Sequence, residues 1–321
     1  MTPRRSIILI YYREPDYLRS CVAALEREFP LAEETEIIVV DNASGDGVAK
    51  KVAAEYPRIV LVSSKENLFY GKGANLGMES AHGDWFLIMN VDVVWQPGAL
   101  RAFVADAEVD ERVALAGPLV RYPDGRVQIT ARHSFPTAWS VWVDYCLPLQ
   151  QLLMRFGHHP DQYSAAGHAH RRLVAHLTGV CLYVRRSVYD AVSGFDPKYT
   201  MYLEETDWQR AMESAKLTRW LLPAGTITHF GSAQKTFAQA SPQYLYGLSR
   251  YVQKWWRGPW AQQQLIAVWW TSWFVSMVTL ALAFLPSLIV PRVAGRVRHY
   301  LASYIRLGAN LSRFRLTNSF S

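Results

Sequence analysis

Carboxylates at the ends of apolar runs are the groups in this chain best suited to chemistry. The apolar run 86–89 is typical of a buried strand, and Asn90-Val91-Asp92 follows it directly. A second acidic cluster, Glu204-Glu205-Thr206-Asp207, lies much later, and His229 ends another apolar stretch. An acidic motif that leaves a buried strand can present ligands to a metal and a phosphate. The second cluster can supply a general base, and the histidine can complete a metal shell, so these residues indicate metal-assisted transfer from a nucleotide-activated donor.

Alternating strand and helix patterns must position these groups. Apolar, β-branched runs predict strands over 6–10, 36–40, 59–62 and 85–89. Helical spacing predicts helices over 16–29, 48–56 and 73–81. This alternation predicts an α/β fold with a mostly parallel, Rossmann-like sheet and right-handed crossovers. Because ligands gather at the C-terminal ends of parallel strands, we expect one edge of the sheet to carry Tyr11, Tyr12, Asp41, Asn90 and Asp92.

The segment 129–177 is less regular and carries most of the histidines. They are His133, His158, His159, His168, His170 and His176. No carboxylate or cysteine set accompanies them, so we predict solvated loop histidines in a variable segment that faces the acceptor. Beyond it the pattern predicts helices over 185–192 and 205–215 and a late strand over 221–229. Cys21, Cys146 and Cys181 have no paired spacing, so they imply neither a disulfide framework nor a metal site.

In these features the chain resembles the GT-A glycosyltransferases of family 2, especially the bacterial rhamnosyltransferase-like branch. The resemblance spans residues 5–235 and rests on motifs that occur in the family's order. These motifs are Tyr11-Tyr12-Arg13, Asp41-Asn42-Ala43-Ser44, Asn67 with Asn75 and Gly77, Asn90-Val91-Asp92, Thr178-Gly179 with Arg185-Arg186, Gly194-Phe195-Asp196, the segment 202–207, and His229. The resemblance implies a GT-A fold and a nucleotide-sugar donor.

Three positions depart from the family pattern. Phe69 stands where the family usually has glycine, which puts the turn there in question. Asn90 replaces the first aspartate of the Asp-x-Asp motif, as is common in this branch, and the metal then loses one charged ligand. Glu205 stands where aspartate is usual, so a base at this position reaches one methylene further.

The resemblance also implies catalytic roles. Asp92 and His229 would bind a divalent cation, Mg²⁺ or Mn²⁺, which neutralises the charge that develops on a diphosphate leaving group. Glu205 would be the general base of a single displacement with inversion, and Glu204 and Asp207 would tune it or anchor the acceptor. The structural alternatives are a strand-end turn for Asp92, a core or loop histidine at 229, and carboxylates that only favour a helix N-terminus.

Binding roles follow from the same motifs. Donor binding is expected at Tyr11, Tyr12, Asp41, Asn67, Gly73, Asn75 and Asn90. Asp41 could accept the ring N–H of uracil or thymine, although Asp-Asn-Ala-Ser also suits an Asx turn or a helix cap. Acceptor binding is expected at Gly179, Tyr202 and Trp208.

Charge is divided unevenly along the chain. All 27 acidic residues lie at or before Glu213, whereas 12 of the 34 lysines and arginines lie after it. Residues 265–290 carry no charge, tryptophans crowd the entry to this run, and arginines follow its exit. Such flanks on an apolar run of about 20 residues or more are typical of a membrane interface. We therefore predict an anionic membrane surface as partner rather than nucleic acid, for which no recognition motif is present. A buried core helix is the alternative.

The tail also constrains topology. We predict a GT-A domain over 1–240 and a basic, Trp-rich, membrane-associating helical region over 241–321. A single span would place the arginines of 292–315 across the membrane from the catalytic domain, against the positive-inside tendency, and Pro286 interrupts the run. A monotopic or re-entrant arrangement is therefore favoured, with homo-oligomer packing as the alternative. The N-terminal apolar run is too short for a signal peptide, so a catalytic domain on the cytoplasmic face of the inner or plasma membrane is expected.

Together these features predict an inverting, metal-dependent glycosyltransferase of cell-surface polysaccharide assembly. Its acceptor would be a membrane- or lipid-linked glycan, and dTDP-rhamnose is the favoured donor by analogy with one branch. A UDP-hexose or UDP-galactofuranose donor stays open because motifs do not describe a sugar pocket. An inactive GT-A-like membrane scaffold is the alternative of another class, against which Asp92, Glu205 and His229 argue.

Overall fold

The computed structural model describes residues 4–28, 34–56, 58–231, 241–287 and 291–313. These residues form two compact units, one from 1–135 with 162–234 and the other from 136–161 with 235–321. The predicted boundary near residue 240 differs from this division in one segment, because 136–161 belongs to the second unit. That segment contains part of the stretch that the sequence assigned to a variable loop of the catalytic domain.

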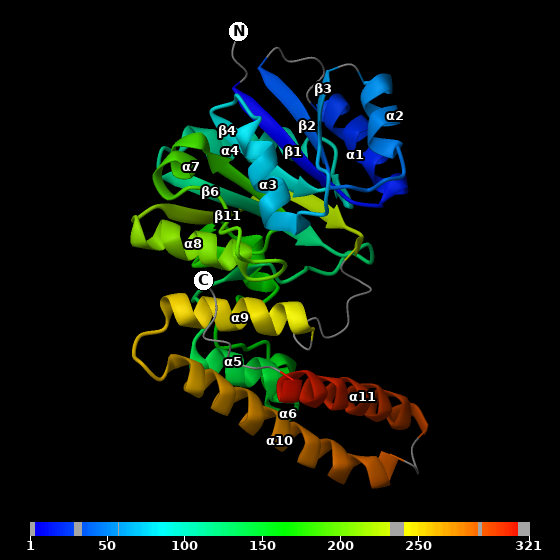
Figure 1. The fold of residues 1–321 in the computed structure, drawn as a ribbon, viewed down its shortest axis with the longest axis vertical. Coiled ribbons are helices and arrows are strands. Elements are labelled where there is room, and N and C mark those ends of the chain that lie inside the picture. The colour runs from blue at the N-terminus through cyan, green and yellow to red at the C-terminus, as the bar shows by residue number, and fades with distance from the viewer. Residues whose placement is uncertain (1–3, 29–33, 57, 232–240, 288–290, 314–321) are drawn as a thin grey trace. The chain divides into compact units, whose positions relative to one another are not determined.

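The first unit is built on a nine-stranded mixed sheet with the order β3-β2-β1-β4-β10-β6-β11-β5, and β8 adds to β11 (Figure 1). The strands are β1 Arg5–Tyr11, β2 Thr35–Asp41, β3 Ile59–Ser63, β4 Trp85–Asn90, β5 Val93–Trp95, β6 Val113–Arg121, β8 Arg172–Leu173, β10 Cys181–Arg185 and β11 Thr218–His229. A separate pair joins β7 Ala131–Arg132 to β9 His176–Leu177. Strands β3, β2, β1 and β4 run parallel, as do β6 and β11. The predicted mostly parallel sheet is confirmed, with β10, β5 and β8 as antiparallel members.

Helices cover both faces of this sheet. They are α1 Pro15–Glu28, α2 Val48–Glu55, α3 Phe69–Glu79, α4 Ala99–Val109, α7 Arg186–Val192 and α8 Glu204–Ser214. Successive strand residues face opposite sides: Ile7 and Leu9 pack with α1, α2 and α4, whereas Ile8 packs with α3, α7 and α8. Burial on both faces explains why these strands are continuous apolar runs rather than alternating patterns. The helix over 99–109 was not predicted.

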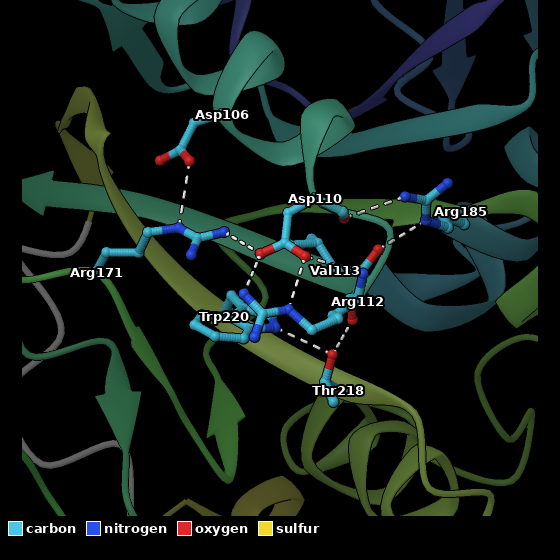
Figure 2. A network of polar contacts seen from close by, with 8 residues as sticks. All are labelled: Asp106, Asp110, Arg112, Val113, Arg171, Arg185, Thr218 and Trp220. Atoms are coloured by element: carbon cyan, nitrogen blue, oxygen red, sulfur yellow. Dashed lines mark hydrogen bonds and ion pairs between the residues drawn. The ribbon is translucent and has the colours of Figure 1, made fainter.

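A polar network ties the start of β6 to the start of β11 (Figure 2). Asp110 accepts hydrogen bonds from Arg112 at 2.9 Å and from Arg171 at 2.6 Å, and these cations hold the pKa of its carboxyl well below the usual range. The two guanidinium carbons lie 5.5 and 4.6 Å from the centre of the Trp220 ring. Arg185, the last residue of β10, donates to the Val113 carbonyl at 2.7 Å and so connects β10 to the network. The network lies at the strand starts, away from the strand ends where the predicted site residues stand.

The second unit is helical. It contains α5 Ala138–Tyr145, α6 Leu147–Arg155, α9 Pro242–Trp255, α10 Ala261–Ser287 and α11 Pro291–Arg313. One face of α10, with Leu265, Trp269 and Leu280, is buried against the other helices. Helix α11 returns along α10, because the Trp273 indole N–H donates to the Tyr304 carbonyl at 2.8 Å while Tyr304 donates to the Tyr145 carbonyl at 2.7 Å. Helix α10 includes Pro286 and ends at Ser287, so the proline lies at the end of the helix and does not break it.

The prediction of solvated loop histidines is wrong for three of the six. The His159 ring is almost fully buried between Asp144 at 3.0 Å and Asp161 at 2.8 Å, and these carboxylates raise its pKa to about 9 against the opposing effect of burial. His168 is fully buried and accepts from the amides of Thr130 and Ala131. His176 is buried and stacks on Phe135. Among the described residues no group of three or more His, Cys, Asp or Glu side chains is placed to hold a metal. The contacts of His159, His168 and His176 hold local structure together.

Candidate active site

The C-terminal ends of β1, β2 and β4 lie at one edge of the sheet. Tyr11 is opposite Asp41 in the β1–β2 register, and Ile10 is opposite Asn90 in the β1–β4 register. The chain proceeds from β1 to β2 and β3 on one side and then returns to place β4 on the other side. Such a reversal of strand order opens a ligand crevice at the strand ends. The structure therefore places the strand-end residues Tyr11, Asp41 and Asn90 at one edge of the sheet as expected, and their role in donor binding stays a prediction.

A pair of asparagines closes the loop that leads into α3. The Asn42 amide accepts from Leu68 N–H at 2.7 Å and donates to the Phe69 carbonyl at 2.9 Å and to Asn67 Oδ1 at 3.1 Å. Asn67 also accepts from Phe69 N–H at 2.8 Å. Phe69 has a φ of 58°, so it adopts the left-handed conformation that glycine adopts readily. The turn is retained despite the missing glycine, because four hydrogen bonds offset a conformational cost of about 1–2 kcal/mol.

The first donor motif divides into buried and accessible residues. The Tyr11 side chain is fully buried, and its hydroxyl donates to Asp46 at 2.6 Å. Tyr12 is 38% exposed, so its ring is the one accessible to a ligand. Asp41 accepts from Ser44 N–H, three residues further on, at 2.9 Å, so one of its carboxylate oxygens is used within the local turn. A base contact from the remaining Asp41 oxygen stays a prediction.

Gly73 and Asn75 hold α3 in place. A Cβ at Gly73 would lie 3.3 Å from Ile10, so the glycine permits close packing of α3 on β1. Asn75 donates to the Phe195 carbonyl and accepts from the Phe195 amide, both at 2.8 Å. A Cβ at Gly194 would lie 2.2 Å from the Asn75 oxygen. The Asn75 contacts anchor the 194–196 turn to α3. Gly73 and Asn75 therefore have a structural role in addition to their predicted role in donor binding.

Asp92 and His229 meet between neighbouring strands. His229 ends β11 opposite Val93 of β5, and its Nε2 lies 3.3 Å from Asp92 Oδ2. Phe230 N–H donates to the Asp92 carbonyl at 3.0 Å. A Cβ at Gly231 would lie 1.9 Å from Asp92 Oδ2, so glycine is needed beside the carboxylate.

This pair fits a divalent cation. Asp92 is only 5% exposed, and its Oδ1 has no hydrogen-bond partner among the described residues. A buried carboxylate oxygen without a partner is costly unless a ligand satisfies it. One carboxylate and one imidazole are too few to enclose a metal, but Mg²⁺ commonly takes one or two carboxylates together with substrate phosphates and water. The donor set is thus suited to a cation shared with a diphosphate.

Strained backbone leads into the second carboxylate pair. Helix α8 begins at Glu204, directly after Tyr202 with φ 70° and Leu203 with φ 67°. Two successive non-glycine residues at positive φ are uncommon and persist where packing enforces them, often at functional sites. They direct Glu204 and Glu205 inward from the first turn of α8, whose dipole favours negative charge.

Gly179 links the carboxylates to the Asp92 strand. Its backbone N–H acts on the Glu205 carboxylate to lower that group's pKa, and its carbonyl accepts from the Tyr70 hydroxyl. The neighbouring Val180 carbonyl accepts from Asn90 N–H at 3.2 Å. Glu205 therefore lies near residue 179, and the next residue is hydrogen-bonded to the strand end that leads to Asp92.

The two glutamates have different environments. Burial, with the adjacent Glu205 charge, raises the pKa of Glu204 to about 8, and its Oε2 has no partner within the described ranges. Burial also raises the pKa of Glu205, but backbone N–H groups, that of Gly179 among them, and the Arg132 charge oppose this rise. Burial and the neighbouring charge therefore favour the protonated form of Glu204, whereas backbone N–H groups and Arg132 favour the charged form of Glu205.

Glu204→Gln is expected to stabilise the protein at neutral and alkaline pH and to leave its stability unchanged in acid. Because folding raises this pKa, the folded state holds the proton, and stability declines as pH rises from ~4.3 towards about 8. Glutamine does not titrate, so the variant should keep a free energy of unfolding that is about 1–3 kcal/mol higher than that of wild type at neutral pH. Denaturant unfolding across this pH range measures the difference, with exposed Glu79→Gln as control. Parallel pH curves for wild type and variant would contradict the assignment.

Two predicted site residues lie behind the site instead of in it. Trp208 is 1% exposed, and its indole donates to the Ser193 carbonyl at 2.7 Å, so it has no surface for an acceptor. Asp207 is buried and accepts from the Tyr199 hydroxyl at 3.3 Å. Both fix α8 on the fold. Tyr202 is partly exposed and close enough to Glu204 for that charge to raise its pKa, so its predicted acceptor contact stays open.

Several residues at the site were not predicted as site residues. Asn42 organises the α3 turn, Tyr70 supports Gly179, Arg132 acts on Glu205, and Gln128 bonds the His229 ring at 3.0 Å. Asn42 and Tyr70 lie inside motif segments that the sequence had singled out, 41–44 and 67–77. Arg132 and Gln128 lie outside them and far along the chain from their partners, so local pattern carried no signal for these two.

An α/β fold with a mostly parallel sheet, carrying an Asp–His pair and buried carboxylates near its strand ends, defines a GT-A-like protein. The model of the family Glycosyl transferase family 2 matches residues 6–192, which is more than half of the chain. The chain belongs to this family and is a glycosyltransferase.

Relatives and solved structures agree with this assignment. The N-acetylglucosaminyl-diphospho-decaprenol L-rhamnosyltransferase of Mycobacterium tuberculosis is 28% identical over 291 residues, which cover 81% of this chain and 88% of that protein. The O-antigen biosynthesis protein RfbC of Myxococcus xanthus is 25% identical over 80% of this chain but only 20% of its own length. The mannosyltransferase PcManGT from Pyrobaculum calidifontis, solved with GDP-Man and Mn²⁺, superposes with a TM-score of 0.58 at 14% identity, covering 98% of this chain and 87% of that one. That likeness is evidence for the fold.

Proposed function

We propose that this chain is an inverting, metal-dependent rhamnosyltransferase that moves a sugar from dTDP-rhamnose to a lipid-linked sugar diphosphate. One observation carries the proposal: Glu205 lies near Gly179, and the next residue, Val180, is hydrogen-bonded to Asn90 at the strand end that leads to Asp92 and its partner His229. The mycobacterial relative, whose name specifies rhamnose transfer to a lipid-linked acceptor, supports the choice of donor and acceptor.

The residues divide the reaction between them. Glu205 accepts the proton of the acceptor hydroxyl while that oxygen forms a bond to the anomeric carbon. The bond from this carbon to the diphosphate oxygen breaks, and its electron pair leaves with the nucleoside diphosphate. Asp92 and His229 would hold a Mg²⁺ or Mn²⁺ ion, which as a Lewis acid neutralises the charge that develops there. Attack from the face opposite the leaving group inverts the anomeric configuration.

A donor panel tests the proposal. Full-length protein is assayed with dTDP-rhamnose, UDP-hexoses and UDP-galactofuranose, a lipid-linked GlcNAc diphosphate as acceptor, and Mg²⁺, Mn²⁺ or EDTA. Cation-dependent turnover of dTDP-rhamnose supports donor and metal together. Turnover confined to a UDP-sugar would reassign the donor, and undiminished turnover in EDTA would contradict the metal.

We also propose that the second unit lies on an anionic membrane surface. Helix α10 is long and apolar enough to cross a membrane by composition, with 28% of its most apolar window buried, a feature that a core helix can share. Its open side carries the exposed apolar side chains Trp270, Phe274, Val275, Val278 and Leu282. Helix α11 returns along it with Arg298, Arg306 and Arg313 exposed. If α10 crossed the membrane, α11 would bring two of these arginines into the hydrocarbon core, at a cost of about 2.5–3.5 kcal/mol each. This cost supports an arrangement in which the helices lie in the plane of the membrane, and we place them on the cytoplasmic leaflet.

Replacing Arg298, Arg306 and Arg313 together by glutamine is expected to weaken binding to phosphatidylserine-containing vesicles by about 100-fold, since each surface cation contributes about 1 kcal/mol. Binding to neutral vesicles should change little. The matched control replaces three exposed cations of the first unit, Lys51, Arg58 and Lys65, by glutamine. Vesicle flotation measures binding. Self-association without vesicle binding would favour homo-oligomer packing through this unit.

A further inference from the structure

A tight hairpin after β6 delivers a glutamine to the His229 ring. Tyr122 N–H donates to the Arg126 carbonyl at 2.8 Å, and Gln128 N–H then donates to the Val120 carbonyl at 2.9 Å. Strand β6 runs beside β11, with Arg121 in register with Thr228. The hairpin therefore returns Gln128 to the end of the strand that carries His229.

The contact determines which ring nitrogen carries the proton. Gln128 Oε1 lies 3.0 Å from His229 Nδ1, and an amide oxygen can only accept, so the ring donates from Nδ1. A neutral imidazole has one N–H, and its Nε2 then presents a lone pair. That nitrogen lies 3.3 Å from Asp92 Oδ2. At this distance the Nε2 lone pair and the Asp92 oxygen repel each other unless a cation binds between them.

We propose that Gln128 is a positioning residue that holds His229 as the Nδ1–H tautomer, with Nε2 directed to a divalent cation on Asp92. This inference rests on the proposed metal dependence. The aspartate is already held by Phe230 N–H on its carbonyl and by the tight space beside Gly231, so the imidazole is the partner that needs orienting. Outer hydrogen bonds of this kind fix ring orientation and raise ligand basicity, and their loss costs about 10–100-fold in metal affinity.

Two substitutions separate orientation from packing. Gln128→Met keeps nearly the same shape but has no strong acceptor, and Gln128→Glu keeps an acceptor oxygen at the same position. Gln96→Met is the matched control, because Gln96 is exposed just after β5. The full chain is titrated with Mn²⁺ at saturating dTDP and followed by electron paramagnetic resonance. Thermal unfolding of each variant reports whether the fold is intact.

We expect the Mn²⁺ dissociation constant to rise about 10–100-fold in Gln128→Met and to stay near the wild-type value in Gln128→Glu and in Gln96→Met. Nitrogen chemical shifts of the His229 ring in metal-free protein, at a pH where the ring is neutral, provide an independent readout. The Nδ1–H tautomer should dominate in wild type and lose its dominance in Gln128→Met.

The outcomes distinguish this inference from the proposed function. Unchanged Mn²⁺ affinity in a folded Gln128→Met protein, or an Nε2–H tautomer in wild type, overturns the role of Gln128 while leaving metal dependence intact. If wild-type protein transfers sugar but binds no Mn²⁺, the proposed metal dependence is wrong. The positioning role of Gln128 then fails with it, whichever tautomer His229 adopts. Loss of affinity in both Gln128 variants with normal folding also contradicts the inference, because the acceptor oxygen would then not be the determinant.

Discussion

Replacing Glu205 by glutamine is expected to lower the rate of sugar transfer by about 10²–10⁴-fold, the usual contribution of a general base. Glutamine keeps the shape and keeps an oxygen that can face the Gly179 N–H, but it cannot accept the acceptor proton. Donor binding should be nearly unchanged, because the carboxylate acts on the acceptor hydroxyl. Steady-state kinetics with a nucleotide-binding measurement on the same protein tests both statements.

The pH profile gives a second test of this base. Burial raises the pKa of Glu205, so the wild-type rate should rise with pH up to a higher value than for an exposed glutamate. The variant should lose this acid limb. Glu79→Gln, on an exposed position of α3, is the control for a neutral substitution elsewhere. Wild-type turnover in Glu205→Gln, with the acid limb retained, would show that another group is the base.

Replacing Asp92 by asparagine is expected to abolish metal-dependent transfer and to weaken Mn²⁺ binding at least ~100-fold. The substitution removes the carboxylate that lies 3.3 Å from the His229 ring, and divalent cations need a charged oxygen there. Asparagine is of equal size, so the clearance from Gly231 is kept. Metal titration and turnover in Mg²⁺, Mn²⁺ and EDTA measure the effect.

Asp106→Asn provides the matched control, because Asp106 pairs with Arg171 in the network at the strand starts. That variant should bind metal and transfer sugar as wild type does. An Asp92→Asn protein that is active and insensitive to EDTA would exclude a catalytic cation on this pair. An inactive variant with unchanged Mn²⁺ affinity would place the metal elsewhere.

The strand ends that carry the candidate site were predictable because they depend on local pattern. A continuous apolar run predicts a strand buried on both faces, and strand–helix alternation predicts parallel pairing. Once the sheet is parallel, residues that directly follow its strands must lie at one edge. Asp41, Asn90 and Asp92 are where this argument placed them.

The roles of motif residues were less predictable than their places. Asn75 and Trp208 belong to motifs, yet the first bonds the backbone of Phe195 and the second is buried behind α8. A motif marks positions where a residue type is required, and packing can require it as strictly as binding does. Phe69 shows the converse, since a residue that departs from the motif keeps the left-handed turn through the hydrogen bonds of Asn42 and Asn67.

The sequence by itself determined the alternation of strands and helices, the acidic motif at a strand end, the second carboxylate pair and the basic, apolar tail, because each depends on neighbours in the chain. Only the tertiary structure decided which nitrogen of His229 faces Asp92, which groups act on the pKa values of Glu204 and Glu205, and that residues 136–161 join the tail helices. These features depend on contacts between distant segments, such as Gln128 with His229 at a separation of 101 residues. Burial and hydrogen bonding act through space, so a pattern that reads along the chain does not contain them.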